Sequence, residues 1–442
     1  MTDDVLGTAR DALGTGPLCD PCLGRLLADR SFGLTNRERG RGLRVAVALA
    51  DDVPVADLGA EEPCWVCEGE STADRVAEWA ERAAYGLSDY EFDTFQVGTR
   101  VPPLFEENDR LLREEVGLDP EAGEALNAEL NREVGKRFGR ETGAEVEFGR
   151  PDAQVTLHLG DDTVETRVNS AFVYGRYRKL EREIPQTKWP CNDCNGTGLT
   201  RGEVCDGCDG SGYRYDESVE QLTAPVVREA MDGESATFHG AGREDVDALM
   251  LGEGRPFVIE VDAPRRRRVD TDALEADIAD FAGGKVEVRD LQVVTYETVE
   301  RVKELDASKT YRMAVAFDAP VAADRFAAAL ADLDGTTVEQ RTPGRVDHRR
   351  ADKVRTREVY DIEGELEDDR HATVELHGEG GLYVKELVSG DEGRTEPSLA
   401  GLLGVDAEVT QLDVLAVEGE DEPFLPPEFV REAGAPESGS TG

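Results

Sequence analysis

Residues 239–257 read HGAGREDVDALMLGEGRPF, and this stretch decides how the second half of the chain is interpreted. The strand-like segment SATFHG ends at residue 240, and another, RPFVIEVDAP, begins at residue 255. Glycines flank the acidic residues between them, so the pattern predicts a turn that projects the carboxylate of Asp245, with Arg243 two positions earlier. A solvated acidic loop is the competing interpretation, and chemistry alone favours neither.

Working outward from this turn, strand patterns alternate with single helices from residue 218 onward. The strands outnumber the helices and several should be antiparallel neighbours, which favours an α+β sheet domain over a doubly wound one. We predict this domain over residues 216–430, with a disordered tail at 431–442. Its predicted elements include strands at 286–294, 311–320 and 382–390, and helices at 271–284, 322–333 and 398–404.

The N-terminal part predicts a smaller α/β region over residues 73–180, with a start as early as residue 45 left open. A helical pattern, a strand and a long helical region are followed by the alternating strands QVTLHL and SAFVYGRY, which complete the unit near residue 178. Residues 1–72 form a separate segment around LRVAVALA, which fits either a helix or a strand.

The cysteines predict metal sites, because all eight lie in CxxC pairs. Two CxxC turns complete a tetrahedral zinc site, whereas a redox dithiol is the alternative for each pair. The later pairs repeat as CxxCxGxG and resemble the zinc-binding unit of DnaJ-type chaperones, which predicts a compact module over 185–215. Neither set has an open position or a neighbouring His and Glu pair, so one or two structural Zn²⁺ ions are expected. The two sets are Cys19, Cys22, Cys64 and Cys67, and Cys191, Cys194, Cys205 and Cys208.

The formal net charge of −45, from 95 acidic and 50 basic residues, would ordinarily exclude a nucleic-acid partner. However, the acidic residues are spread through the chain and the basic ones are mostly arginine, a pattern typical of adaptation to high salt. The charge therefore describes the solvent. No apolar run is long enough for a membrane helix, and the first residues lack a signal-peptide plan, so a cytoplasmic protein is expected.

The stretch GREDVDALMLGEGRPF resembles the catalytic motif of pseudouridine synthases, and in full it is similar to the archaeal/eukaryotic tRNA enzyme of the T-arm type. SKTYRMAV at 308–315, the segments at 340–357 and 380–399, and QTKWPC agree, so the resemblance covers roughly residues 185–417. It implies isomerisation of uridines 54 and 55 of tRNA in a central active-site cleft, by a monomer, without a catalytic or nucleotide cofactor. An N-terminal THUMP-like RNA-binding domain is implied as well.

The resemblance also assigns roles to individual residues. Asp245 is the essential carboxylate, acting as a nucleophile at C1′ or as a base, and Arg243 helps to hold the target nucleotide out of its stack. Lys385 pairs with Asp245 and keeps it ionised. Tyr311 stacks on the uracil and assists proton removal at C5, although a buried strand aromatic is the alternative. Tyr383, placed on the same strand face as Lys385, lines the substrate pocket, and Leu412 contacts the base or belongs to the core.

Two arginine-dense stretches are candidate phosphate contacts, because basic patches on an acidic protein concentrate nucleic-acid binding. Solvated ion-pair networks are the alternative. The first stretch is Arg265 to Arg268, and the second comprises Arg341, Arg345, Arg349, Arg350, Lys353, Arg355 and Arg357.

Two other functions compete with the enzyme. A non-catalytic zinc-dependent RNA-binding or chaperone-like protein would use the CxxCxGxG repeat and the basic stretches. A thiol oxidoreductase would use the CxxC pairs, but the many glycines and the absence of a thioredoxin-like βαβ pattern count against it.

Overall fold

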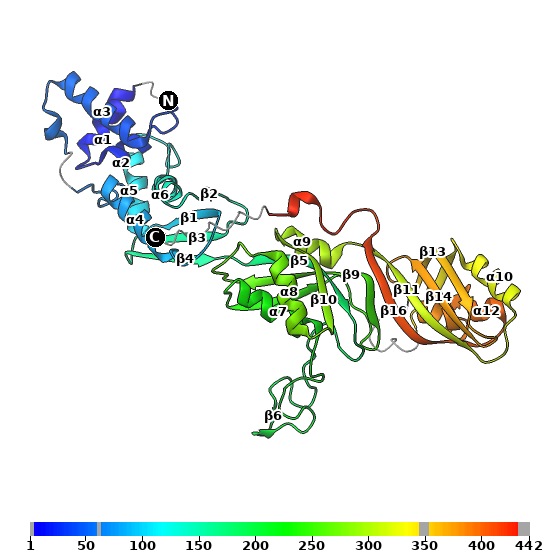
Figure 1. The fold of residues 1–442 in the computed structure, drawn as a ribbon. Coiled ribbons are helices and arrows are strands. Elements are labelled where there is room, and N and C mark those ends of the chain that lie inside the picture. The colour runs from blue at the N-terminus through cyan, green and yellow to red at the C-terminus, as the bar shows by residue number, and fades with distance from the viewer. Residues whose placement is uncertain (1–3, 60–62, 344–352, 432–442) are drawn as a thin grey trace. The chain divides into compact units, whose positions relative to one another are not determined.

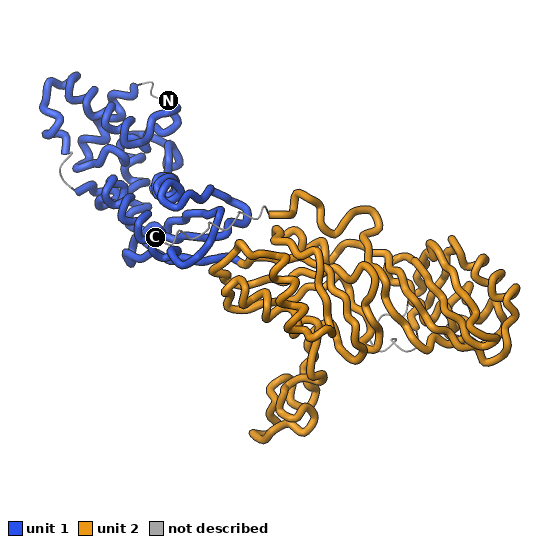
Figure 2. The backbone as a smooth tube through the Cα atoms, in the orientation of Figure 1, with its two compact units in different colours: residues 1–169 blue, residues 170–442 orange. Residues whose placement is uncertain are grey.

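The computed structural model describes residues 4–59, 63–343 and 353–431. The chain divides into two compact units, Met1–Asn169 and Ser170–Gly442, which Figure 2 distinguishes by colour. Each unit contains its own buried cluster of apolar side chains. Among the described residues, no helix has the length and apolar character needed to cross a membrane.

Helices dominate the first unit. Helix α3 answers the question left open by LRVAVALA, because Thr35 and Glu38 form a reciprocal capping box that starts a helix. The expected long helical region is two helices, α5 and α6, separated by residues 116–125. The helices are α1 (Val5–Gly14), α2 (Asp20–Arg25), α3 (Asn36–Asp51), α4 (Ala73–Gly86), α5 (Pro103–Glu115) and α6 (Leu126–Thr142), with a short 3-10 turn, η1 (Val55–Leu58).

A four-stranded sheet of order β2-β1-β3-β4 completes the first unit. Strands β1 and β3 are parallel, and β3 and β4 form an antiparallel hairpin. Every second residue of β3 is buried, as expected for a strand with one face against a core. Phe95 of β1 packs edge-on against Phe138 of α6, with ring centroids 4.7 Å apart. The strands are β1 (Thr94–Arg100), β2 (Glu145–Val146), β3 (Ala153–His158) and β4 (Thr163–Val168).

The second unit is built on one ten-stranded sheet of order β10-β5-β9-β16-β11-β14-β13-β12-β15, with β8 also paired to β9 (Figure 1). Among the described strands of this sheet, β9 and β16 are parallel neighbours and the other pairs are antiparallel. The predicted α+β class with a mostly antiparallel sheet is confirmed. The strands are β5 (Ala171–Lys179), β8 (Ser235–Gly240), β9 (Leu249–Asp262), β10 (Val286–Val294), β11 (Ala307–Phe317), β12 (Thr337–Arg341), β13 (Val354–Leu366), β14 (His371–Gly378), β15 (Thr395–Glu396) and β16 (Ala407–Gly419).

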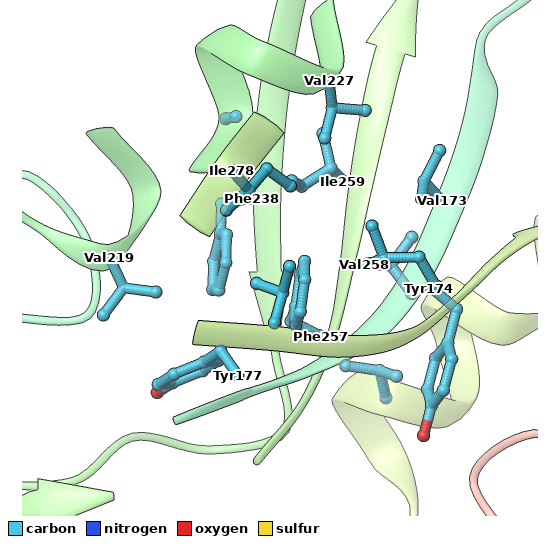
Figure 3. Close-up of a cluster of buried hydrophobic side chains, with 14 of the residues drawn as sticks. Val173, Tyr174, Tyr177, Val219, Val227, Phe238, Phe257, Val258, Ile259 and Ile278 are labelled. Atoms are coloured by element: carbon cyan, nitrogen blue, oxygen red, sulfur yellow. The ribbon is translucent and has the colours of Figure 1, made fainter. Parts of the chain in front are cut away.

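Two apolar clusters support the two ends of this sheet. Figure 3 shows part of the first, in which the rings of Phe238 and Phe257 stack 5.3 Å apart between β8 and β9. The second cluster packs α10 and α12 against the strands around β14. The helices are α7 (Val219–Ala230), α8 (Thr271–Ala282), α9 (Glu297–Glu304), α10 (Ala323–Leu333), α11 (Val384–Ser389) and α12 (Leu399–Leu403), with short 3-10 turns at η3 (Asp391–Gly393) and η4 (Pro427–Phe429).

Strand β5 corrects one expectation from the sequence. We expected SAFVYGRY to complete the N-terminal α/β region, but β5 pairs with β9 on one side and β10 on the other. Its alternation of apolar residues indicates a strand equally well in either sheet, and partners distant in sequence decide which one. Helices α7 and α9 and strand β13 were not predicted.

A short module interrupts the second unit between β5 and α7. It holds a hairpin of two-residue strands, β6 (Leu199–Thr200) and β7 (Glu203–Val204), and the later four cysteines. Backbone bonds close the stem that carries it, from Cys191 N to Gly212 O at 2.8 Å and from Arg214 N to Trp189 O at 2.9 Å. The module therefore begins and ends at neighbouring points of the stem.

Candidate active site

Asp245 lies on the loop between β8 and β9, at residues 241–248, as the turn pattern predicted. Its Oδ2 atom is 3.1 Å from Nζ of Lys385, which comes from a segment 140 residues further along the chain. The two side chains are 51% and 30% exposed, respectively, so the carboxylate is paired and still open to a substrate. The residue pair implied by the family resemblance therefore forms in the folded chain.

A cluster of buried charged side chains packs against the inner side of this loop. The side chain of Glu244, next to Asp245, is fully buried and accepts a hydrogen bond of 2.8 Å from the Tyr177 hydroxyl. Nε of Arg255 lies 2.8 Å from the same carboxylate, and Nζ of Lys179 lies 3.8 Å away. Buried carboxylates are stable only when opposite charges and hydrogen bonds surround them, and Glu244 has both.

The same two basic side chains also hold the loop backbone. Nζ of Lys179 donates to the carbonyl oxygens of Ile184, Asp245 and Val246 at 2.8, 3.3 and 3.1 Å. Arg255 donates to the carbonyl oxygen of Ala241 at 2.8 Å. Burial lowers the pKa of Lys179, and the nearby Glu244 carboxylate partly opposes this shift. Because both ends of the loop are bonded to one buried cluster, the direction of the Asp245 side chain is set from inside the protein.

Tyr311 lies on β11, next to β16, and packs against both apolar clusters of the second unit. Burial raises its pKa to about 12, and the Asp245 carboxylate adds to this effect while Arg255 opposes it. The interaction places Tyr311 near Asp245. At neutral pH its phenol is therefore protonated, so the hydroxyl is available as a hydrogen-bond donor.

The segment that carries Lys385 corrects a second expectation. We expected a strand with Tyr383 and Lys385 on one face, but α11 begins at Val384 and Tyr383 is its N-cap. The buried residues Val384, Leu387 and Val388 follow helical spacing, which a short apolar run does not distinguish from a strand. Tyr383 is partly buried, and its backbone is bonded in both directions to the side chain of Gln340. Lys385 reaches Asp245 from the first turn of this helix.

Leu412 lies on β16, paired with Met313 of β11, while Tyr311 pairs with Val414 two residues along. The four side chains share one face of the sheet, because paired residues of neighbouring strands point to the same side. Leu412 is partly buried against the same apolar cluster as Tyr311. It therefore lies beside the tyrosine and packs against the core, and its contact with the base stays a prediction.

Arg243 is exposed, and its guanidinium carbon lies 5.8 Å from the ring centroid of Trp189. Trp189 belongs to QTKWPC, the segment that leads into the cysteine module. The structure thus places Arg243 on the loop that carries Asp245, but beside an aromatic residue that the sequence analysis did not select.

Both cysteine sets form compact quartets, whose sulfur atoms all lie within 4.8 Å of one another in each set. The measured separations are 3.7 Å for Cys19 and Cys67, 3.9 Å for Cys191 and Cys205, and 3.7 Å for Cys194 and Cys208. A tetrahedral zinc with bonds of about 2.3 Å would hold its sulfurs about 3.8 Å apart. The quartets therefore have the donor set and the spacing of metal sites.

Backbone amides stabilise the sulfurs of the later quartet. The amides of Gly198 and Gly212 donate to Cys194 and Cys208 at 3.3 Å each. Both glycines have positive φ, and a Cβ on either would lie within 2.5 Å of a carbonyl oxygen of the other half of the repeat. Glycine is required at both points, which explains the CxxCxGxG pattern.

The earlier quartet has a charged support instead. Arg25, whose side chain is 1% exposed, donates to the sulfur of Cys22 at 3.2 Å and pairs with Asp109 and Glu129 at 2.8 and 3.0 Å. A buried arginine beside a thiolate favours the ionised sulfur that a metal binds.

The arginine-dense stretches combine exposed basic side chains with ion-paired ones, so both interpretations of them remain. Arg267 is buried, and Arg265 pairs with Asp232 at 3.5 Å. In the second stretch Arg357 pairs with Glu379 at 3.1 Å, while Arg341 and Lys353 are exposed. Arg345, Arg349 and Arg350 lie outside the described residues.

Sequence reasoning missed the residues that hold the loop. Glu244 and Arg255 stand within the motif quoted first, but neither was selected, because charged residues in an acidic chain are usually exposed. Lys179 and Tyr177 lie on β5, and no motif in their own stretch of sequence indicates that they contact the Asp245 loop. Asp413, next to Leu412, was missed as well: it accepts from the amide of Leu249 at 3.1 Å and ties β16 to the end of the loop.

Comparison with known proteins agrees with this geometry. A family model described as "Pus10, C-terminal" matches residues 172–418, and one described as "Pus10 THUMP domain, archaeal" matches residues 79–158. A relative from Halorubrum lacusprofundi, named tRNA pseudouridine synthase Pus10, is 66% identical over 97% of this chain and 100% of its own. One of the same name from Methanothrix thermoacetophila is 44% identical over 95% of this chain and 96% of its own.

The family model over residues 172–418 and the named relatives show the class of the protein: it is an isomerase of the pseudouridine synthase type. Within that class, one family model covers most of the second unit and the other covers residues 79–158 of the first. The chain belongs to the Pus10 family.

Proposed function

We propose that this chain converts uridine to pseudouridine in the T arm of tRNA, at positions 54 and 55, with Asp245 as the essential carboxylate. The observation that carries the proposal is the contact of 3.1 Å between Asp245 and Lys385 on a loop fixed by buried charges. The name shared by the relatives supports tRNA as the substrate. The choice of the T arm rests on the resemblance of the motif.

The reaction is an isomerisation, so its atoms balance without a cofactor. The bond from N1 of uracil to C1′ of the ribose breaks, the base turns, and C5 bonds to C1′, while the C5 proton leaves and N1 gains one. Asp245 acts as a nucleophile at C1′ or removes a ribose proton. Either role needs the ionised carboxylate, which Lys385 favours by placing a positive charge beside it.

The surrounding side chains suit a uridine extruded from its stack. Tyr311 offers a ring near Asp245, and Leu412 lies beside it on the neighbouring strand. Base stacking on an aromatic ring contributes about 1–3 kcal/mol in RNA-binding proteins. Because the phenol has a pKa of about 12 in the free enzyme, it is neutral at physiological pH, and the ring would stack on the bound uracil while the hydroxyl serves as a hydrogen-bond donor. Arg243 would contact the phosphate or sugar of the target nucleotide, and Tyr383 the edge of its pocket.

Each cysteine quartet is proposed to hold one structural Zn²⁺. The four-sulfur donor sets, their spacing and the amide and arginine donors support this assignment. A zinc ion with four thiolate ligands has no open position, so its contribution is to fix the local fold. The chemistry at the uridine uses only the side chains of the second unit.

The experiment is a comparison of wild type with Asp245→Asn on unmodified tRNA in high salt. Pseudouridine is mapped by carbodiimide-dependent stops of reverse transcription, and tRNA affinity is measured by filter binding. We expect stops at positions 54 and 55 with wild type, and none with Asp245→Asn at unchanged affinity. The matched control Asp247→Asn alters an exposed aspartate of the same loop and should retain the stops. Equal stops with wild type and Asp245→Asn would refute the enzyme assignment and favour the non-catalytic RNA-binding alternative.

A further inference from the structure

Two residues at the base of the cysteine module contact the loop that carries Asp245. The first is Gln186, whose amide nitrogen donates to the carbonyl oxygen of Gly242 at 2.8 Å and to the Tyr177 hydroxyl at 2.9 Å. A Cβ placed on Gly240 would lie 2.6 Å from this amide, so the end of β8 packs closely on Gln186. The backbone before Asp245 is thus bonded to the segment that enters the module.

The second residue is Trp189, three positions later. Its ring lies 5.8 Å from the guanidinium carbon of Arg243 and makes an edge contact with Tyr215 at 5.5 Å. The carbonyl of Trp189 accepts from the amide of Arg214 across the stem, and Arg214 also lies 5.8 Å from the indole ring. Trp189 belongs to one segment of the stem, and its ring contacts Arg214 and Tyr215 of the other segment. Both segments of the stem therefore fix the position of the ring.

Trp189 contacts Arg243, which is the one basic side chain of the loop at 241–248. Arg243 is exposed, and an exposed arginine samples many rotamers unless a neighbour restricts it. The face of an indole ring is the strongest aromatic partner for a guanidinium. Arg243 is two residues from Asp245, so the rotamer that Trp189 favours decides where a positive charge stands beside the reacting nucleotide.

We propose that Trp189 is a positioning residue for Arg243, and that the module thereby takes part in arranging the active site. The proposal rests on the proposed function, because it assumes that Arg243 contacts the RNA. If the module only stabilised the fold, the contact of Gln186 with the end of β8 and with Gly242 would be enough. An indole ring beside Arg243 would not be required.

A double-mutant cycle tests the proposal on the full-length protein. The single-turnover rate of pseudouridine formation is measured for wild type, Trp189→Leu, Arg243→Gln and the double variant. We expect Trp189→Leu to slow the reaction about two- to fivefold, the strength of a cation–π contact at an exposed site. In the Arg243→Gln background the same change should have no further effect. An equal loss in both backgrounds would overturn the proposal.

Two further measurements separate positioning from stability. Trp189→Phe keeps an aromatic face and should restore most of the rate, with the metal content of every variant unchanged. In protein labelled with 5-fluorotryptophan, the ¹⁹F signal of Trp189, identified by its absence in Trp189→Phe, should move in Arg243→Gln and stay in place in Arg228→Gln, an exposed arginine of α7. If the ¹⁹F chemical shift stayed the same in Arg243→Gln as in Arg228→Gln, the contact between Trp189 and Arg243 would be contradicted. This result would hold even if Trp189→Leu failed to fold.

The outcome is distinguishable from failure of the proposed function. If Asp245→Asn retained turnover, the catalytic assignment would fail whatever the cycle gave. If Asp245→Asn were inactive, the catalytic assignment would stand. If Trp189→Leu then slowed the reaction equally with and without Arg243→Gln, the proposed role of Trp189 would be refuted.

Discussion

At the scale of single residues, the contact between Asp245 and Lys385 joins two segments that are distant in sequence and meet only in the folded sheet. Lys385 extends from the first turn of α11, while Asp245 sits on a loop fixed from below. The aspartate is therefore held from two independent directions. Changes to either partner should alter turnover before they alter RNA binding.

Lys385→Met should lower turnover about tenfold, the lower range for loss of a charge-assisted hydrogen bond between partly exposed groups. Lys385→Arg, which keeps the charge, should recover part of this loss. The measurement is the single-turnover rate with saturating enzyme, alongside tRNA affinity. Lys303→Met, at an exposed lysine of α9, is the matched control and should leave the rate unchanged. Equal rates for the Lys385→Met and control variants would contradict the pairing.

Tyr311→Phe and Tyr311→Ala separate the ring from its hydroxyl. Because burial and Asp245 raise the pKa to about 12, the tyrosine is neutral below that pH and ionises only as pH rises toward it. The rate should therefore show no tyrosine ionisation between about pH 7 and 9. Tyr311→Phe should keep most of the tRNA affinity, whereas Tyr311→Ala loses stacking of about 1–3 kcal/mol, or roughly 5- to 150-fold. Identical losses in the two variants would argue against stacking.

The sequence singled out Lys385 and Tyr311 only through a resemblance of motifs, whereas the glycine-flanked turn also pointed to Asp245. The spacing of glycines predicted the turn that carries Asp245, but nothing in that stretch predicted its pairing with Lys385. Glu244, Lys179 and Arg255 escaped notice because burial of a charged side chain depends on partners brought together by the sheet. Such clusters have no signature in a single sequence.

At the scale of elements, the loop at 241–248 depends on the buried Glu244 carboxylate. Glu244→Gln would leave Arg255 and Lys179 without their negative partner, at a cost of about 3–5 kcal/mol. We expect a clear fall in the calorimetric melting temperature together with slower turnover. Glu253→Gln, at a 68%-exposed glutamate paired with Arg289, should stay within about 0.5 kcal/mol of wild type. Similar melting temperatures for both variants would show that the cluster does not support the loop.

The two cysteine quartets should bind metal independently, because they lie in different units. Cys194→Ser and Cys22→Ser should each lower the zinc content from two ions per chain to one. The measurement is inductively coupled plasma mass spectrometry of the purified protein. Retention of both ions in either variant would remove the corresponding quartet from the assignment.

Elements whose sequence has a clear periodicity were predicted well, whereas a short apolar run left the choice between helix and strand open. Helices α8 and α10 and strands β10 and β11 have clear periodicity and are confirmed. The segment at α11 is six residues long, within the range where an apolar run fits both a helix and a strand. Strand β13 was hidden by its arginines, since its charged residues suggested a binding segment.

At the scale of the whole molecule, the formal charge of −45 makes the fold dependent on the ionic environment. At 0.1 M salt the screening length is about 10 Å, so neighbouring carboxylates repel one another, and at 1 M it falls to about 3 Å. The melting temperature should therefore rise steeply as KCl increases from 0.1 to about 2 M. Choline chloride at equal ionic strength should give a similar initial rise if screening is the cause. A melting temperature independent of both salts would contradict this explanation.

Strand β16 occupies an inner position of the ten-stranded sheet, yet in sequence it follows every other strand that the structure describes in that sheet. Before residues 407–419 leave the ribosome, β9 and β11 each lack a neighbour and the loop end at Leu249 lacks its Asp413 anchor. Contacts this distant in sequence form slowly, and unpaired strand edges invite aggregation. We therefore expect the Asp245 loop to gain its full set of contacts only after β16 has emerged and joined the sheet.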